Sequence, residues 1–380
     1  MTNFDDIRPY HDSEVRPILD RLLTDQELAD AVARLKFPRA AGPMGWLLRP
    51  LVQFAMRRQM SGVETVLGFQ EVVKSYMQRM IDTTTTALTA SGLEHLDPEG
   101  AYLFVSNHRD IAMDPAFVNW TLYHAGFNTL RIAIGDNLLT KPYVSDLMRL
   151  NKSFIVNRSA KAPREKLKAA KHLSAYIHHS IADDHANVWI AQREGRAKDG
   201  RDLTNSAVVG MFSLSRAKTQ PFSDYIRELK IVPVSISYEW DPCDVAKARE
   251  LFQQRSSGSY QKSEHEDVKS IARGIAGQKG HVHVAFGDVL KGEYDDTDQV
   301  VAEIDRQIAQ NYVLHATNCL AWERLNGDLP ELEYSYPAIP YNPDGLGELR
   351  QQFELRLANI PADHRALVLD MYANPVAAKL

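Results

Sequence analysis

Short apolar runs and helical repeats alternate through the middle of the chain. Residues 115–125, 163–182 and 205–217 carry apolar side chains at helical spacing. The remaining apolar runs have the length of buried strands, and they cover residues 101–105, 130–134, 153–156, 187–191, 231–237 and 282–286. Strands that alternate with helices predict an α/β fold with a mixed, largely parallel sheet covered by helices. Catalytic groups in such sheets usually follow the carboxyl ends of strands.

Both ends of the chain show helical patterns instead. These patterns cover residues 14–35 as two short helices, 62–81 as a helix capped by Ser61, 298–325, and 346–372 as a terminal pair. Residues 329–345 contain several prolines and predict an extended crossing. We therefore predict three domains, namely a helical cap at 1–90, an α/β domain at 91–295 and a helical extension at 296–380.

Composition and charge exclude several classes of protein. Hydrophobic residues make up 44% of the chain and charged residues 24%, which are ordinary values for a globular protein. The net charge of −5 and the pI of about 6.2 do not suit a dedicated nucleic-acid binder, which should be basic. The mean hydropathy is −0.33. Since no stretch of about 18 apolar residues is uninterrupted, we expect no membrane-spanning helix.

The cysteines and the first residues indicate the compartment. Cys243 and Cys319 are too few to staple a chain of 380 residues, and they lack the spacing of a zinc cluster. We expect free thiols in a reducing compartment. Residues 1–15 are acidic and have no apolar core, which argues against a signal peptide. These features together predict a cytoplasmic location.

A histidine with two nearby carboxylates follows the run at 101–105. His108 comes directly after this predicted strand, and Asp110 and Asp114 lie within six residues of it. Pro115 suits the first turn of a helix, and Asp114 suits its N-cap. A neutral imidazole held by a carboxylate can take a proton from a hydroxyl group. A surface turn with an ordinary histidine fits this fragment equally well.

A second polar segment follows the run at 187–191. Residues 193–201 contain four cations and two glycines. Glycines let backbone amides approach an anion, and arginine binds phosphate with two parallel hydrogen bonds. This density favours an anion site over a solvated charged loop. Two further strings say little alone: Arg158 ends the strand at 153–156, and Pro233 marks the run at 231–237 as an edge or irregular strand.

The order of these four strings resembles the glycerolipid acyltransferase superfamily, which includes glycerol-3-phosphate and 1-acylglycerol-3-phosphate acyltransferases. The family shows an NHxSxxD or HRSHxD block, a phenylalanine–arginine strand, an EG-containing arginine block and a proline-centred strand. The matching residues are Asn107-His108, Phe154 to Arg158, Glu194-Gly195-Arg196 and Val232-Pro233-Val234, with Gly92-Leu93-Glu94 resembling the family's entry segment. The resemblance covers roughly residues 90–240.

The first block departs from the family in its spacing. Five residues separate His108 from Asp114, where the family usually has four, and Asp110 falls where many members have serine. Either carboxylate could therefore orient the histidine. We prefer Asp114, because it occupies the expected helix start, as the family's aspartate does. The third block is also shorter by one glycine than the EGGR form of some glycerol-3-phosphate enzymes.

The resemblance implies acyl transfer without an acyl-enzyme intermediate. His108 would remove the proton of an acceptor hydroxyl, which then attacks the thioester of acyl-CoA or acyl-carrier protein. The resemblance assigns the acceptor phosphate to Arg158, Arg196 and Lys198, in a pocket shaped by Glu194 and Gly195. It implies no cofactor and no metal. A non-catalytic module that binds acyl chains or carrier protein is the alternative, and a hydrolase is a third reading, weakened by the absence of a G-x-S-x-G elbow.

Acceptors and products of this family are lipids, so contact with a bilayer is expected. Residues 44–60 combine aromatic and aliphatic side chains with Arg49, Arg57 and Arg58, as an interfacial helix does. A helix packed on the rest of the protein is equally compatible with this composition. The interfacial reading predicts peripheral attachment to the inner face of the cell membrane.

Overall fold

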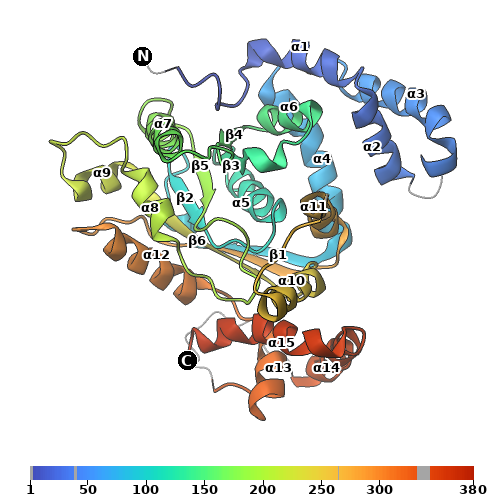
Figure 1. The fold of residues 1–380 in the computed structure, drawn as a ribbon, viewed down its shortest axis with the longest axis vertical. Helices are drawn as coiled ribbons and strands as arrows, with labels where there is room; N and C mark the ends of the chain where they lie inside the picture. The colour runs from blue at the N-terminus through green and yellow to red at the C-terminus, as the bar shows by residue number, and fades with distance from the viewer. Residues whose placement is uncertain (1–2, 38–40, 264, 332–342) are drawn as a thin grey trace. The chain divides into compact units, whose positions relative to one another are not determined.

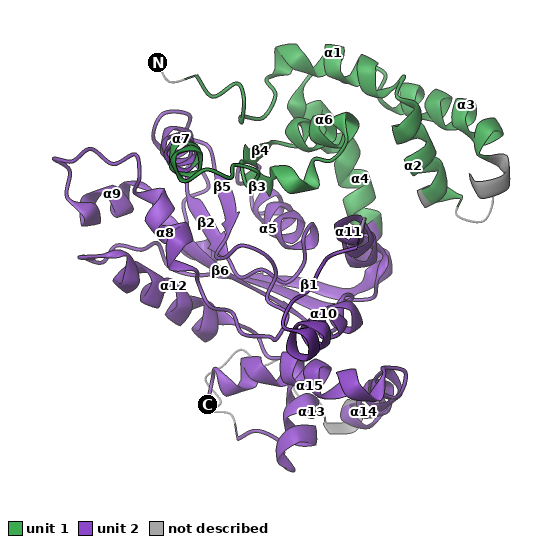
Figure 2. Ribbon diagram, in the orientation of Figure 1, with its two compact units in different colours: residues 1–79, 131–169 green, residues 80–130, 170–380 purple. Residues whose placement is uncertain are grey.

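The computed structural model describes residues 3–37, 41–263, 265–331 and 343–380. The chain divides into two compact units, shown in different colours in Figure 2. Unit 1 comprises Met1–Arg79 and Arg131–Ala169, and unit 2 comprises Met80–Leu130 and Ala170–Leu380. The predicted domain boundaries after residues 90 and 295 stay a prediction.

Unit 1 is mainly helical and has one pair of strands. Its elements are α1 (Asp12–Leu22), α2 (Gln26–Lys36), α3 (Ala41–Gln59), most of α4 (Val66–Thr84), β3 (Arg131–Gly135), α6 (Pro142–Leu150), β4 (Ser153–Val156) and the start of α7 (Pro163–Ala182). Strands β3 and β4 pair in parallel. The apolar stripe of α1 packs against α4 and α6 through Leu19, Phe69 and Leu150, which confirms helical structure at this end of the chain.

Unit 2 contains a sheet of five strands, in the order β1-β7-β6-β2-β5. Its strands are β1 (Thr85–Ser91), β2 (Leu103–Ser106), β5 (Val188–Ala191), β6 (Ile231–Tyr238) and β7 (Gly280–Phe286). Strand β6 is antiparallel to β7, and the other pairs are parallel. Together with β3 and β4, these strands confirm the predicted α/β class with a mixed, largely parallel sheet (Figure 1).

Helices complete unit 2. They are α5 (Met113–His124), α8 (Ser206–Phe212), α9 (Phe222–Glu228), α10 (Asp244–Ser257), α11 (Glu266–Ala276), α12 (Thr297–Asn311), α13 (Ala316–Asn326), α14 (Pro343–Ala358) and α15 (Ala362–Ala377). The terminal pair was expected from the sequence. It packs on α13 and α10 around Phe353, Leu367 and Met371. Most of the predicted crossing at 329–345 lies outside the described residues.

The register of the sheet brings the carboxyl ends of three strands together. Val105 of β2 lies opposite Ile190 of β5 on one side and Pro233 of β6 on the other. All side chains of β2 and β6 are buried. Because the three strands run parallel, the residues that follow β2 and β5 lie at the same end of the strands, beside the last residues of β6.

Two details of the elements expected near the N-terminus differ from the structure. Residues 85–90 were expected in the helical cap, but they lie in β1 (Thr85–Ser91). This strand is largely exposed and rich in threonine and alanine, so it contains no apolar run from which a strand could be predicted. The helix predicted over 62–81 begins instead at Val66, whose backbone N–H donates to Asp12 Oδ1 at 2.8 Å, and not at a Ser61 cap.

The sequence left two readings for the strand around Pro233, an edge strand or an irregular strand, and the edge reading is wrong. Strand β6 has a neighbour on both sides. A proline is tolerated because the ladder with β7 begins only at Val234. Pro233 still accepts a hydrogen bond through its carbonyl oxygen from Gly287 N–H, at 2.8 Å. The missing N–H of proline therefore costs the sheet no bond on this side.

No helix in the described part of the chain has both the length and the apolarity needed to cross a bilayer.

Three histidines of unit 2 form a largely buried cluster away from the first block. Thr89 Oγ1 lies 2.6 Å from His281 Nε2 and 2.7 Å from His283 Nδ1. His315 precedes α13, and its ring is 5.3 Å from that of His281. Burial lowers the pKa of His283 to about 4 and that of His315 to about 3. The rings of His283 and His315 are therefore neutral at physiological pH.

We expect the free energy of unfolding to fall as the pH drops from about 6.5 toward 4. His283 titrates near 4 in the folded protein and near 6.5 when unperturbed. The unfolded chain therefore binds a proton in a range where the folded protein does not, so stability is complete above pH 6.5 and is lost on acidification. Denaturant unfolding at several pH values measures this slope. His283→Gln should make the slope shallower, with His315 supplying part of the remainder, and His95→Gln, at an exposed ring, should not change it. Equal slopes in wild type and His283→Gln would contradict the account.

Candidate active site

His108 and Asp114 meet directly after β2. His108 Nδ1 lies 2.9 Å from Asp114 Oδ2, and the Asp114 side chain is fully buried. An ionised carboxylate only accepts hydrogen bonds, so Nδ1 carries the hydrogen and Nε2 of the neutral ring keeps its lone pair. The ring also packs edge-on against Trp189, at 6.1 Å between centroids. About an eighth of the His108 side chain remains exposed, at 13%. The arrangement is that of an oriented base.

Asp114 is held by three further donors. The backbone N–H groups of Arg109 and Asp110 donate to its Oδ2 at 2.6 and 2.9 Å. The hydroxyl of Tyr238, at the end of β6, donates to its Oδ1 at 2.7 Å. Burial raises the pKa of Tyr238 well above its usual range, with the charge of Asp114 as the second cause, so this hydroxyl keeps its hydrogen. These bonds fix the carboxylate before any substrate arrives.

The predicted helix start needs one correction. Helix α5 begins at Met113, two residues earlier than Pro115, and Asp114 does not cap it. Asp110 caps the start of the helix instead. Its Oδ1 accepts hydrogen bonds from the backbone N–H groups of Ala112 and Met113, at 3.0 and 2.9 Å. Because the helix starts earlier, Asp114 lies inside its first turn and faces the imidazole.

Asp110 lies close to the pair but makes no hydrogen bond to the ring of His108. Burial raises the pKa of its carboxyl group, and the neighbouring charge of Asp114 is the second cause. A Cβ added at Gly274 of α11 would come within 2.2 Å of Asp110 Oδ2. Helix α11 therefore packs closely over this loop, at a position where only glycine fits.

A buried ion pair ties the first block to the third. Arg109 Nη2 donates to Asp202 Oδ2 at 2.6 Å and to the carbonyl oxygen of Gly200 at 3.2 Å. Asn107 Nδ2 donates to the same Asp202 oxygen at 2.9 Å. The guanidinium of Arg109 also lies over the ring of Tyr312, 5.3 Å from its centroid. The loop after β5 is thus fixed against the loop that carries His108.

The loop after β5 is braced from the C-terminal helices as well. Asn374 of α15 donates through Nδ2 to the carbonyl oxygen of Asp199 at 2.7 Å. Gly200 has a φ of +81°, and a Cβ there would lie 2.1 Å from the carbonyl oxygen of Met371. Closer to the site, Ala197 N–H donates to the carbonyl oxygen of His108 at 2.7 Å. Arg196 is therefore one residue from a direct contact with the histidine's backbone.

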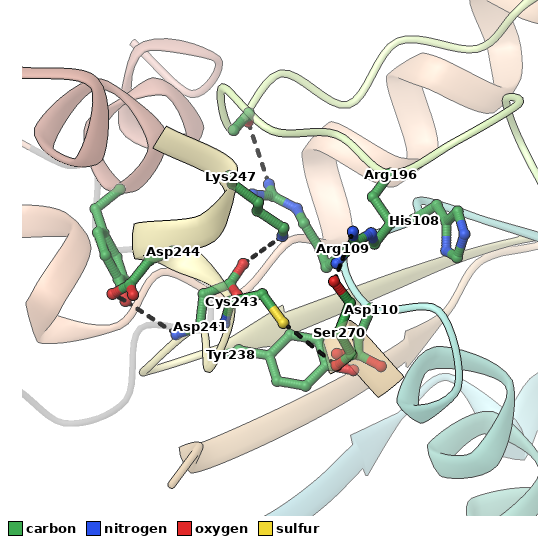
Figure 3. A network of polar contacts seen from close by, with 12 residues as sticks. His108, Arg109, Asp110, Arg196, Tyr238, Asp241, Cys243, Asp244, Lys247 and Ser270 are labelled. Carbon is green, nitrogen blue, oxygen red and sulfur yellow. Dashed lines mark hydrogen bonds and ion pairs between the residues drawn. The ribbon is translucent and has the colours of Figure 1, made fainter. Parts of the chain in front are cut away.

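Arg196 is the cation of this loop that is buried and incompletely bonded. It is 9% exposed. Its Nη2 lies 3.4 Å from Ser270 Oγ of α11, and its Nη1 is buried without a hydrogen-bond partner among the described residues. Figure 3 shows Arg196 with His108, Asp110 and Ser270. An unpaired guanidinium nitrogen is costly to bury unless an anion meets it in the working state.

The other predicted site residues are placed differently. Glu194 and Gly195 are exposed on the loop. Lys198 forms an ion pair with Glu250 of α10 at 2.5 Å, so its charge is already compensated. Arg158 follows β4 in unit 1, where its backbone N–H donates to Asp136 Oδ1 at 3.0 Å. The convergence of Arg158 with Arg196 stays a prediction.

Sequence reasoning missed the residues that hold the pair in place. Tyr238, Asp202 and Ser270 contact Asp114, Arg109 and Arg196, respectively. Tyr238 is the last residue of the proline-centred strand and lies on the same face as Ile236, two residues earlier. The alternation of side chains along the strand was the one sequence signal that could have placed it. Ser270 lies in a helix far along the chain, and nothing local marks it. In the described part of the chain, no three histidine, cysteine, aspartate or glutamate residues are grouped to hold a metal ion.

Comparison with known proteins agrees with this geometry. Residues 87–237 match the model of a protein family described as Acyltransferase. The segment begins in β1 and ends in β6, and it contains all four blocks of the sequence. The resemblance to an acyltransferase is therefore confirmed over this segment, and it supports an enzyme that transfers acyl groups.

The other comparisons add less. One similar solved structure is that of the 1-acyl-sn-glycerophosphate acyltransferase PlsC from Thermotoga maritima, with 13% identity and a TM-score of 0.35. The likeness covers 75% of this chain and 95% of that one. This score is too low to establish a shared fold. No curated protein is similar enough in sequence to match.

Asp114→Asn should reduce acyl transfer much more than Asp110→Asn. At position 114, an asparagine has no negative charge to stabilise the imidazolium of His108, and an amide nitrogen turned toward the two backbone N–H groups would make donor–donor contacts. An asparagine at position 110 can keep its oxygen on Ala112 and Met113. We expect a loss of roughly 10²-fold or more for the first variant and less than about tenfold for the second. Initial rates on folded proteins measure it, and the reverse order would assign the orienting role to Asp110.

Proposed function

We propose that the protein moves a fatty acyl group from an acyl thioester to a hydroxyl of a glycerol phosphate or lysophospholipid acceptor. The observation that carries the proposal is the contact between His108 and the buried Asp114 inside the acyltransferase-family segment. A module that only binds acyl chains has no use for an oriented base. The product of such a reaction is a phospholipid or its precursor, which puts the enzyme in phospholipid biosynthesis.

The chemistry follows from the free nitrogen of the ring. His108 Nε2 takes the proton of the acceptor hydroxyl as its oxygen attacks the thioester carbonyl. Asp114 stabilises the imidazolium that forms. When the tetrahedral intermediate collapses, the carbon–sulfur bond breaks and the thiolate recovers the proton from His108. The acyl group goes directly to the acceptor, so no nucleophilic side chain and no metal or cofactor is required.

Arg196 is the side chain that we assign to the acceptor phosphate. Its Nη1 has no partner in the described residues, and its loop is bonded to the backbone of His108. A phosphate bound there would hold a nearby hydroxyl close to Nε2, which is the main advantage of positioning. Arg158 and Lys198 would add charge, and Glu194 and Gly195 would shape the mouth of the pocket. Lys198 would have to leave Glu250 to contribute.

Helix α3 offers a surface for peripheral membrane contact. Trp46, Leu51 and Phe54 are 75%, 58% and 65% exposed on it. The opposite face packs on α2, where Val52 contacts Ala29 and Ala33, with Leu48 partly buried. Arg49 is paired with Asp30 at 2.8 Å, whereas Arg57 and Arg58 are exposed at the end of the helix. We propose that this face meets the inner side of the cell membrane and that the protein is otherwise cytoplasmic.

The function is tested by incubating purified protein with labelled acyl-CoA or acyl-carrier protein. Glycerol 3-phosphate, lysophosphatidate and other lysolipids serve as acceptors. We expect transfer to at least one acceptor and a loss of roughly 10²–10⁴-fold in His108→Ala, because a positioned base contributes about that much. Release of free fatty acid without transfer would indicate a hydrolase. Binding without either reaction would indicate a non-catalytic module, and full activity of folded His108→Ala would exclude the proposed base.

The membrane proposal is tested by sedimentation with anionic vesicles. Each exposed apolar side chain can contribute about 1.5–3 kcal/mol at most, and Arg57 and Arg58 roughly 1 kcal/mol apiece. We expect reversible binding that weakens with salt and is largely lost in Trp46→Ser/Phe54→Ser.

The matched control for the vesicle experiment is Leu355→Ser, an exposed apolar position of α14 in unit 2, at 58%. It should bind vesicles as the wild type does. Equal binding by wild type and the α3 double variant would show that membrane contact lies elsewhere.

A further inference from the structure

A second site lies in unit 2, outside the segment that matches the acyltransferase family. It is a cavity of about 550 Å³ formed by α10, α11 and α14. Three arginines line it, one from each helix: Arg249, Arg273 and Arg356. A single carboxylate, that of Asp244, lines it too. The lining is therefore positively charged in a chain whose net charge is negative.

The arginines differ in how far they are already compensated. Arg356 Nε donates to Asp244 Oδ2 at 2.6 Å, and its Nη2 donates to the carbonyl oxygen of Asp241 at 3.0 Å. Arg249 lies near the hydrogen-bonded pair of Tyr260 and Glu266. The side chain of Arg273, in the last turn of α11, has no hydrogen bond or ion pair among the described residues.

We infer that this cavity binds the phosphate groups of a nucleotide, namely the 3′-phosphorylated adenosine diphosphate of an acyl-CoA donor. The inference rests on the proposed function, because it concerns the thioester substrate of that reaction. Guanidinium groups bind phosphate with paired hydrogen bonds. A volume of about 550 Å³ is within the usual range of small-molecule sites, roughly 300–1,000 Å³. Arg356 is held in place by Asp244 and would form a fixed side of the site. Arg249 and Arg273 would turn their guanidinium groups toward the phosphates.

The position of the cavity suits the donor rather than the acceptor. None of its lining residues belongs to the His108–Asp114 pair or to the loop that carries Arg196. The phosphate of glycerol 3-phosphate is only a few bonds from the reacting hydroxyl, so it must bind beside His108. In CoA the long pantetheine arm separates the thioester from the nucleotide, which therefore has to bind at some distance from the base.

Helix α11 connects the two sites. Ser270 on this helix contacts Arg196, and Gly274 packs against Asp110. Arg273 lies between these positions in the sequence and lines the cavity. Figure 3 shows the polar residues from His108 and Arg196 through Ser270 and Cys243 to Asp244. Asp244 is one of the residues that line the cavity. A nucleotide held by Arg273 would thus lie on the same helix that packs over the catalytic loop.

Calorimetric titration of the full chain with CoA tests this directly, since CoA carries no acyl group and does not turn over. The comparison ligands are 3′-dephospho-CoA, pantetheine and glycerol 3-phosphate. The variant is Arg249→Gln/Arg273→Gln, which leaves the Arg356–Asp244 ion pair intact. Arg255→Gln is the control, because it removes an exposed arginine of α10 that does not line the cavity.

We expect wild type and the control to bind CoA more tightly than 3′-dephospho-CoA. The double variant should bind CoA at least roughly tenfold more weakly, discriminate less between the two nucleotides and bind pantetheine unchanged. Unchanged CoA affinity in the double variant, no CoA binding by wild type, or a loss confined to glycerol 3-phosphate would each overturn the inference.

The titration and the acyl-transfer assay together separate this inference from the proposed function. Transfer from acyl-carrier protein by a wild type that does not bind CoA would refute the nucleotide site and leave acyl transfer standing. CoA binding that depends on Arg249 and Arg273, in a protein without transfer activity, would support the site and refute the enzymatic proposal.

Discussion

The carboxylate of Asp114 is buried completely, and the site is organised around the need to satisfy it. A buried charge is tolerated only when it is hydrogen-bonded on both oxygens. Two backbone N–H groups, the Tyr238 hydroxyl and the His108 ring supply those bonds. They come from the loop after β2 and from the end of β6, so the parallel pairing of these two strands is what brings the donors together. The orientation of the imidazole follows from the same bonds, because a neutral ring has a single N–H and the contact with Asp114 places it on Nδ1.

A second layer of contacts keeps the anion-binding loop beside this pair. Arg109 and Asn107 share Asp202, and α15 holds the loop through Asn374 and the close approach at Gly200. The C-terminal helices thus reach the site although they lie outside the family segment. They also form one wall of the arginine-lined cavity, so the part of the chain without recognisable motifs contributes contacts at both places.

Much of this could be predicted from the sequence, for physical reasons that differ between residues. Buried strands such as β2 and β6 can be predicted because they are apolar runs. The four blocks could be recognised because they follow one another in the same order as in the family that the sequence resembles. The exposed strand β1 could not be found in this way, because its threonines and alanines form no apolar run. Asp114 was expected to cap the helix, but Asp110 does so, because the helix begins two residues earlier than Pro115 and leaves Asp114 inside its first turn. Tyr238, Asp202 and Ser270 are brought to the site by long-range packing, which no local pattern encodes.

The account's central claim is that Asp114, fixed by Tyr238, holds His108 in its working orientation. A double-mutant cycle of Tyr238→Phe and Asp114→Asn, measured as the rate of acyl transfer at saturating substrates, tests it most directly. The account predicts that Tyr238→Phe slows the wild type but has little further effect once Asp114 is replaced by asparagine, because both changes disturb the same contact. Strictly additive losses, in variants that remain folded, would contradict it and would mean that Tyr238 and Asp114 act independently.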